Sequence, residues 1–263
     1  MAKFAPLMHN VHQYSGWEKT QSYDFTAADA LAPISVAELS QLVPRYATAF
    51  YRADSDQSFQ YVAILGLYPG HNLYVAPNGQ WIGGYVPAVY RGYPFRILPV
   101  QESDKLALCI DEESTNFQTE ISDTSERFFN NEGELSELMV QVKAFLQAQY
   151  SSRALTEGLI DLLNEYGLLS PWSIKIEGLP EHIPPHTNLY HINEKALKEL
   201  DADKLKVLNL RGALSLAYGQ MFSEHRMKEL IALYDIRAKQ SSKSEEINLD
   251  DVFGEQEDDL FKF

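Results

Sequence analysis

The side chains best suited to chemistry in this chain are aromatic, cationic and imidazole groups gathered in residues 71–95. Arg91 lies in an aromatic run, and a guanidinium can stack on rings and bind a carboxylate through two parallel hydrogen bonds. Tryptophan and tyrosine combine a large, rigid contact area with one polar group. These residue types predict a surface that recognises a ligand or partner. The candidate binding residues are His71, Asn72, Trp81, Tyr85, Tyr90, Arg91 and Tyr93.

Each candidate also has a structural interpretation. Arg91 could form an ion pair with Glu38 or Asp111, and this interpretation is favoured because arginine so often serves packing. The rings of Trp81 and its tyrosine neighbours could line a binding floor or pack around a glycine-rich bend, and the sequence favours neither.

Seven histidines make a metal-dependent enzyme the second hypothesis. His9 and His12 are three residues apart, and His182, His186 and His191 surround a proline-rich loop. The chain has no H-E-x-x-H or H-x-D spacing followed by a further ligand. We therefore expect surface or capping histidines, no bound metal and no cofactor.

Other catalytic motifs are absent from the sequence. It contains no G-x-S-x-G nucleophile elbow, no G-x-G-x-x-G loop and no P-loop. The single cysteine, Cys109, lies in an apolar run and is expected to be a buried structural thiol.

The candidate residues need a shaped backbone to position them. Residues 62–95 hold six of the 14 glycines and four of the 12 prolines, which supply unusual and fixed backbone angles respectively. We expect a strand at 72–76, a hairpin turn at 77–79, a return strand from Trp81 and a short helix at 87–91 that presents Arg91.

The rest of the chain divides in two. Residues 1–33 look irregular, and Ser35 with Glu38 forms an S-x-x-E capping box that starts a short helix over 35–42. Alternating or wholly apolar runs predict strands, and i, i+3, i+4 spacings predict helices. The expected strands are 47–52, 59–68, 95–100, 106–111, 173–176 and 189–192. The expected helices are 134–150, 151–166 with its end at Gly167, 193–200, 204–221 and 224–238.

The predicted fold is α+β, with a mostly antiparallel β-sheet N-terminal half packed with a helical C-terminal half. We expect one domain over residues 1–238, β-rich at 34–120 and helix-rich at 121–238. Residues 239–263 are polar and acidic, which predicts a disordered tail. Its apolar residues Leu260, Phe261 and Phe263 could form a docking peptide, although a solubilising tail is slightly favoured.

The formal net charge of −15 over 263 residues excludes partners that require a basic surface. We expect no nucleic acid partner and no docking on anionic membranes. The sequence has neither a run long enough to span a membrane nor a recognisable signal peptide, so a cytoplasmic location is expected.

Residues 72–95, NLYVAPNGQWIGGYVPAVYRGYPF, resemble a pattern of the SapC family of bacterial proteins: N-L-F/Y, then G-x-W, then Y-x-P-A-x-x-R-x-Y-P-F. VAELSQLVPRYATAFY, LALCIDEES and LNLRGALSLAYGQMFSEHRMKEL are similar to other segments of that family, so the resemblance spans roughly residues 7–235. The chain departs from the family at Ala47–Phe50, where a proline-isoleucine-valine run is frequent, and at Asn188, where glycine is frequent. The membrane permease of the same name is a different protein.

The resemblance implies an accessory role more than a reaction. Members tend to be encoded near TonB-dependent receptors and flavin-dependent halogenases, which implies a part in uptake or tailoring of a substrate. Our leading hypothesis is a binding or accessory protein that recognises a small molecule, peptide or protein partner through residues 71–95. The metal-dependent enzyme is the second hypothesis, and a surface-layer-associated structural protein, disfavoured by the missing export signal, is the third.

Overall fold

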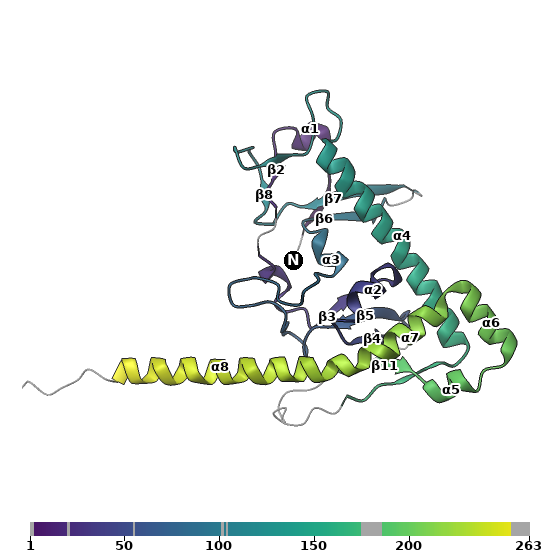
Figure 1. Ribbon diagram of the computed structural model, residues 1–263. Helices are drawn as coiled ribbons and strands as arrows, with labels where there is room; N and C mark the ends of the chain where they lie inside the picture. The colour runs from purple at the N-terminus through teal and green to yellow at the C-terminus, as the bar shows by residue number, and fades with distance from the viewer. Residues whose placement is uncertain are drawn as a thin grey trace, which may run out of the picture.

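The computed structural model describes residues 3–19, 22–54, 56–100, 103, 105–174 and 186–253, with side chains to residue 240. Antiparallel sheets lie mostly in the N-terminal part and long helices in the C-terminal part, so the predicted α+β class is confirmed. Figure 1 shows the sheets side by side, with α4 (Glu137–Glu165) running along one flank. No described helix is both long enough and apolar enough to cross a membrane.

The largest sheet in the described part of the chain has five strands in the order β10-β11-β4-β5-β3. Neighbouring strands pair antiparallel throughout, with Ala49 opposite Val62 at the centre. The helical half therefore contributes two strands to it. The strands are β3 (Leu31–Pro33), β4 (Thr48–Tyr51), β5 (Gln60–Ile64), β10 (Leu169–Pro171) and β11 (Leu189–Ile192).

Two smaller antiparallel sheets complete the described strands. One has the order β1-β7-β6 and the other β8-β2-β9. Their strands are β1 (Phe4–Pro6), β2 (Gly16–Trp17), β6 (Phe95–Pro99), β7 (Leu106–Asp111), β8 (Phe117–Gln118) and β9 (Glu126–Arg127).

The N-terminal arm differs from its prediction as an irregular segment. It supplies β1, β2 and β3, one strand to each of the three sheets, and these pairings satisfy backbone groups that would otherwise lose hydrogen bonds on burial. Because each partner strand is distant in sequence, no local pattern marks the pairing.

The short helices are α1 (His9–His12), α2 (Leu39–Leu42), α3 (Ala88–Arg91) and α5 (Glu194–Lys198), with 3-10 turns η1 (Asp24–Thr26), η2 (Val36–Glu38) and η3 (Glu224–Arg226). The longer ones after α4 are α6 (Ala202–Arg211), α7 (Ala213–Ser223) and α8 (Met227–Phe253). The capping box at Ser35 and Glu38 is present and starts η2, which continues into α2 as predicted.

Helix α4 is one continuous helix of 29 residues, whereas we expected two helices that meet at residue 150. No glycine or proline interrupts the chain there, so helical hydrogen bonding continues. The hydroxyl of Ser136 caps its start by accepting from the backbone N–H of Met139 (3.3 Å), and Gly167, with φ of 68°, follows its end as predicted.

Three other boundaries differ from expectation. The helix predicted over 204–221 is broken at Gly212, whose φ of 86° ends α6 and precedes α7. The strand predicted at 173–176 lies earlier, at β10, and residues 175–185 are outside the described part. Helix α8 continues to Phe253, past the predicted boundary at 238, and projects away from the rest of the chain in Figure 1. The predicted docking residues Leu260, Phe261 and Phe263 lie outside the described residues.

The apolar core forms two clusters that α4 joins. Leu159, Ile160 and Leu163 of its C-terminal half pack in the cluster around the five-stranded sheet. Met139 and Leu146 of its N-terminal half pack in the second cluster, around the smaller sheets. A single helix therefore contributes side chains to both clusters.

Candidate binding site

Residues 65–94 connect β5 to β6 as a largely irregular segment that contains α3 and several turns. The turn at 77–79 is present as predicted: Ala76 N donates to Gln80 O (2.8 Å), and Gly79 adopts a φ of 77°. The strands expected on either side are reduced to a single antiparallel bridge between Val75 and Trp81. The glycine and proline content of the segment explains why a longer ladder does not form.

The carboxylate of Glu38 anchors this segment to η2. Its side chain is buried, with 6% of the residue exposed, and Oε1 accepts from the Tyr85 hydroxyl (3.0 Å) and the Ala88 backbone N–H (2.7 Å). Oε2 accepts from the backbone N–H and the hydroxyl of Ser35 (3.2 and 3.3 Å). Four donors from two segments thus compensate the buried charge.

Arg91 contacts this network through Tyr85. Its Nη2 donates to the Tyr85 hydroxyl (2.9 Å), and its guanidinium lies 5.1 Å from the ring centroids of Tyr85 and Phe145. Burial raises the pKa of Tyr85; nearby Glu38 adds to this rise and Arg91 opposes it. The structural link to Glu38 that we considered for Arg91 therefore runs through a tyrosine and is not a direct ion pair.

Trp81 is fixed by its own hydrogen bonds. Its Nε1 donates to the Tyr46 hydroxyl (2.9 Å) and to the Tyr85 carbonyl (3.0 Å), and its ring stacks on Tyr74. Burial raises the pKa of Tyr46 to about 12. A side chain at Gly83 would collide with the Tyr46 hydroxyl, so glycine is required at this bend.

His71 and Asn72 lie apart from the other candidates. Asn72 is buried, where its Nδ2 donates to Thr26 O (3.1 Å) and its Oδ1 accepts from Tyr74 N (2.9 Å). The imidazole of His71 stacks on Tyr68 with ring centroids 5.4 Å apart. Its pKa is lowered by burial and by the charge of Arg237 on α8.

Tyr90 and Tyr93 line a cavity of about 360 Å³, which we call the acidic cavity. Its walls come from the N-terminal arm, α3, β6 and the end of β7, and Phe25 stacks on Tyr93 with centroids 4.0 Å apart. The lining residues are Phe4, Phe25, Asp29, Val89, Tyr90, Tyr93, Phe95, Arg96, Asp111 and Glu113.

The Tyr90 hydroxyl is a buried polar group of this cavity without a well-formed hydrogen bond among the described residues. The residue is 7% exposed, and within the described part of the chain its buried oxygen has no partner with ordinary hydrogen-bond geometry. The Asp29 carboxylate lies nearby. Burial raises the pKa of Asp29, while Tyr90 and Arg96 oppose the rise. A buried hydroxyl without a well-formed hydrogen bond is costly, so this oxygen would gain from a polar group bound in the cavity.

Asp111 is held differently. Its Oδ1 accepts from the backbone N–H groups of Lys3 (2.9 Å) and Glu113 (3.2 Å), and its Oδ2 accepts from the Tyr93 hydroxyl (3.4 Å). It is 3% exposed and therefore acts mainly as a fixed charge in the cavity wall.

A second cavity, of about 270 Å³, lies between α4 and β6. Val89, Phe95 and Arg96 line both cavities, so the segment after Pro87 separates them. The polar groups buried in its wall are occupied: Glu38 has four donors, and the Thr156 hydroxyl donates to Ser152 O (2.7 Å) and accepts from Val36 N (2.9 Å). This cavity offers mainly apolar contact.

The histidines do not form a metal site in the described part of the chain, where no group of three or more potential ligands is close enough to hold an ion. The ring of His12 contacts Glu112 (3.2 Å), and that of His186 contacts Gly66 O (2.9 Å). His182 lies outside the described residues.

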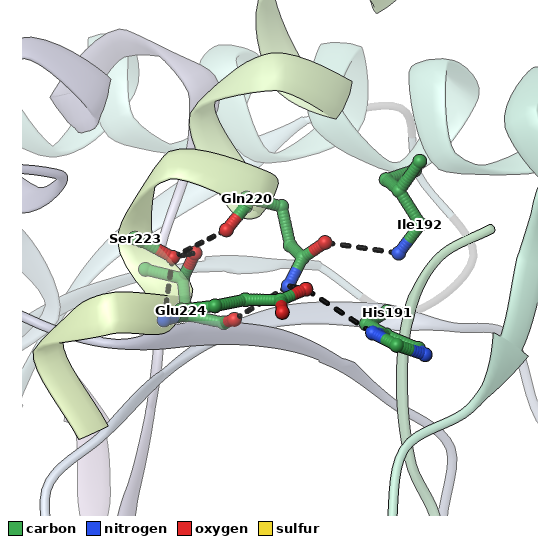
Figure 2. A network of polar contacts seen from close by, with 6 residues as sticks. His191, Ile192, Gln220, Ser223 and Glu224 are labelled. Carbon is green, nitrogen blue, oxygen red and sulfur yellow. Dashed lines mark hydrogen bonds and ion pairs between the residues drawn. The ribbon is translucent and has the colours of Figure 1, made fainter. Parts of the chain in front are cut away.

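Figure 2 shows a buried polar network that joins α7 to β4 and β11. Gln220 accepts from Ile192 N (2.9 Å) and donates to Thr48 O (3.2 Å), and the Ser223 hydroxyl accepts from Thr48 N (3.0 Å). Glu224 contacts the ring of His191 (3.1 Å) at its edge. The sequence did not reveal this network, because its members are far apart along the chain.

A family model matches residues 7–230 and is described as SapC. This chain belongs to the SapC family. No curated protein and no solved structure matches the chain. The SapC match contains every residue that lines the acidic cavity except Phe4.

Four charged residues of the cavity were not proposed as binding residues from the sequence: Asp29, Arg96, Asp111 and Glu113. Acidic residues at the end of a predicted strand, in the segment CIDEES, were an available signal for the last two. Nothing local marks Asp29, which reaches the cavity from the N-terminal arm.

Proposed function

We propose that this SapC-family chain is a binding protein that takes a small molecule, or a side chain of a peptide or protein partner, into the acidic cavity. The observation that carries the proposal is the buried Tyr90 hydroxyl, which lies beside the Asp29 carboxylate without a well-formed hydrogen bond among the described residues, in a cavity with aromatic and charged walls. Concave, aromatic sites with a few fixed polar groups are typical of ligand binding.

Within this proposal, the candidate residues have two roles. Tyr90 and Tyr93 belong to the cavity wall, whereas Trp81, Tyr85 and Arg91 fix the segment that carries them. Binding in a cavity of this size fits an accessory role in uptake or tailoring of a substrate, linked to TonB-dependent receptors or halogenases, and that link is part of the proposal.

The test is a screen of a fragment library of mixed charge by nuclear magnetic resonance, repeated on Tyr93→Ala and Phe25→Ala. We expect hits whose signals are lost in both variants. Tyr14→Ala is a matched control, since Tyr14 is 74% exposed and outside the cavity lining. An absence of hits, or hits that persist in both cavity variants, would contradict the proposed function.

A further inference from the structure

We propose that the acidic cavity selects a small organic molecule carrying an ammonium group on an apolar body. This inference rests on the proposed function and adds the chemical class of the ligand. It follows from the composition of the cavity wall, from the charge the wall carries and from the hydroxyl of Tyr90.

Apart from Val89, the residues that line the acidic cavity are either aromatic or charged. Five of its ten residues are aromatic and four are charged. The aromatic rings pack on one another: Phe25 stacks on Tyr93 and meets Tyr90 edge-on, with centroids 6.2 Å apart. Such rings bury apolar surface and also attract cations to their faces. An apolar body with a positive group satisfies both properties.

The charges of the wall favour a cation over an anion. Three carboxylates, from Asp29, Asp111 and Glu113, face one guanidinium, from Arg96, which leaves two formal negative charges. The guanidinium of Arg96 lies 4.6 Å from the ring centroid of Phe4, so part of its surface is already covered. The net charge of −15 on the chain would also draw cations towards the cavity from solution.

The carboxylates are not equivalent. Asp111 already accepts three hydrogen bonds from Lys3, Glu113 and Tyr93, whereas Asp29 and Glu113 are exposed. An ammonium group bound at Asp29 would lie near the Tyr90 hydroxyl, whose oxygen has lone pairs free to accept a hydrogen bond from it. We therefore assign Asp29 as the principal partner of the ammonium group, with Tyr90 as its neighbour.

The experiment compares three probes of similar shape: benzylammonium, benzyl alcohol and benzoate. Each is titrated into the full chain at neutral pH, and binding is followed by calorimetry and by chemical shifts. We expect benzylammonium to bind more tightly than the other two. Asp29→Asn should weaken its binding roughly twofold to fivefold, which is the size of one partly exposed ion pair. Arg96→Gln should strengthen it.

Asp161→Asn is the matched control, because Asp161 is an exposed carboxylate on α4 that does not line the cavity. Equal binding of all three probes, sensitive to Tyr93→Ala but not to Asp29→Asn, would overturn the ammonium assignment and leave the proposed function intact. Tighter binding of benzoate would overturn it in the same way. Failure of all three to bind would count against both this assignment and, together with an empty fragment screen, the proposed function.

Discussion

The Glu38 carboxylate accepts a hydrogen bond from the backbone N–H of Ala88, 50 positions later in the chain, at 2.7 Å. Glu38 closes the capping box of η2, and Ala88 is the first residue of α3. One buried carboxylate therefore satisfies backbone donors at the starts of two helical segments. This contact fixes the segment that carries Tyr90 and Tyr93 against the five-stranded sheet.

Glu38→Gln should destabilise the fold by about 2 kcal/mol, because a carboxamide has only one acceptor oxygen for the four donors around it. Urea unfolding measures the change. The matched control is Glu137→Gln, which removes a carboxylate from the first turn of α4 and should cost less than about 1 kcal/mol. Equal effects of the two substitutions would contradict the anchoring role of Glu38.

Gln220→Leu should destabilise the fold by about 2–3 kcal/mol. Gln220 is fully buried, and the change leaves the Ile192 N–H and the Thr48 carbonyl without their side-chain partner from α7. Thermal unfolding measures the loss, and hydrogen exchange at Ile192 should rise. The exposed Gln80 offers a control, since Gln80→Leu should leave both quantities nearly unchanged. Unchanged exchange at Ile192 in the Gln220 variant would refute this account of the network.

The elements that the sequence predicted correctly are those with a local physical cause. The capping box at Ser35, the turn at Gly79 and the strands β6 and β7 depend on residues a few positions apart. The long-range pairings had no such signal. Phe4 pairs with Asp111 across the chain, and the N-terminal arm therefore looked irregular in the sequence although it contributes to all three sheets.

The candidate site shows the same contrast between residues with a local sequence signal and residues brought together by long-range contacts. Aromatic residues close together in sequence identified Tyr90 and Tyr93, which line one cavity. Their neighbours from elsewhere could not be found in this way, because β-pairing brings Asp111 beside Tyr93 and the N-terminal arm brings Asp29 beside Tyr90. The sequence also could not separate the ring of Trp81, which is fixed by internal hydrogen bonds, from rings that face a cavity.

Asp29→Asn should raise the melting temperature at pH 7, and the gain should shrink as the pH falls towards 4. Burial raises the pKa of Asp29, so the folded state favours the protonated form. Protonated Asp29 therefore contributes fully to the stability of the fold below the ordinary aspartate pKa of about 3.9. This contribution is lost as the pH rises through the pKa that Asp29 has in the folded protein. The carboxamide of the variant carries no charge at any pH and avoids that loss.

The gain should stay below about 1 kcal/mol, because Asp29 is exposed enough for solvent to screen its charge. Melting curves of both proteins between pH 4 and pH 7 measure it. Asp161→Asn serves as control and should show no such trend. A variant less stable than the parent at pH 7, or a difference that does not change with pH, would contradict the assigned environment of Asp29.

Removal of residues 241–263 should leave the melting temperature nearly unchanged while it lowers the helical signal in circular dichroism. The described contacts of α8 with the core come from its first part, where Met227 and Leu230 are buried and Tyr234 packs against the same cluster. The later turns of α8 extend away from the sheets (Figure 1), so their loss removes helix but little core burial.

Removal of residues 227–263 is the matched comparison and should destabilise the fold by several kcal/mol, because two buried side chains leave the core. A large drop in melting temperature for the shorter deletion would show that the acidic C-terminal segment contributes to the stability of the fold.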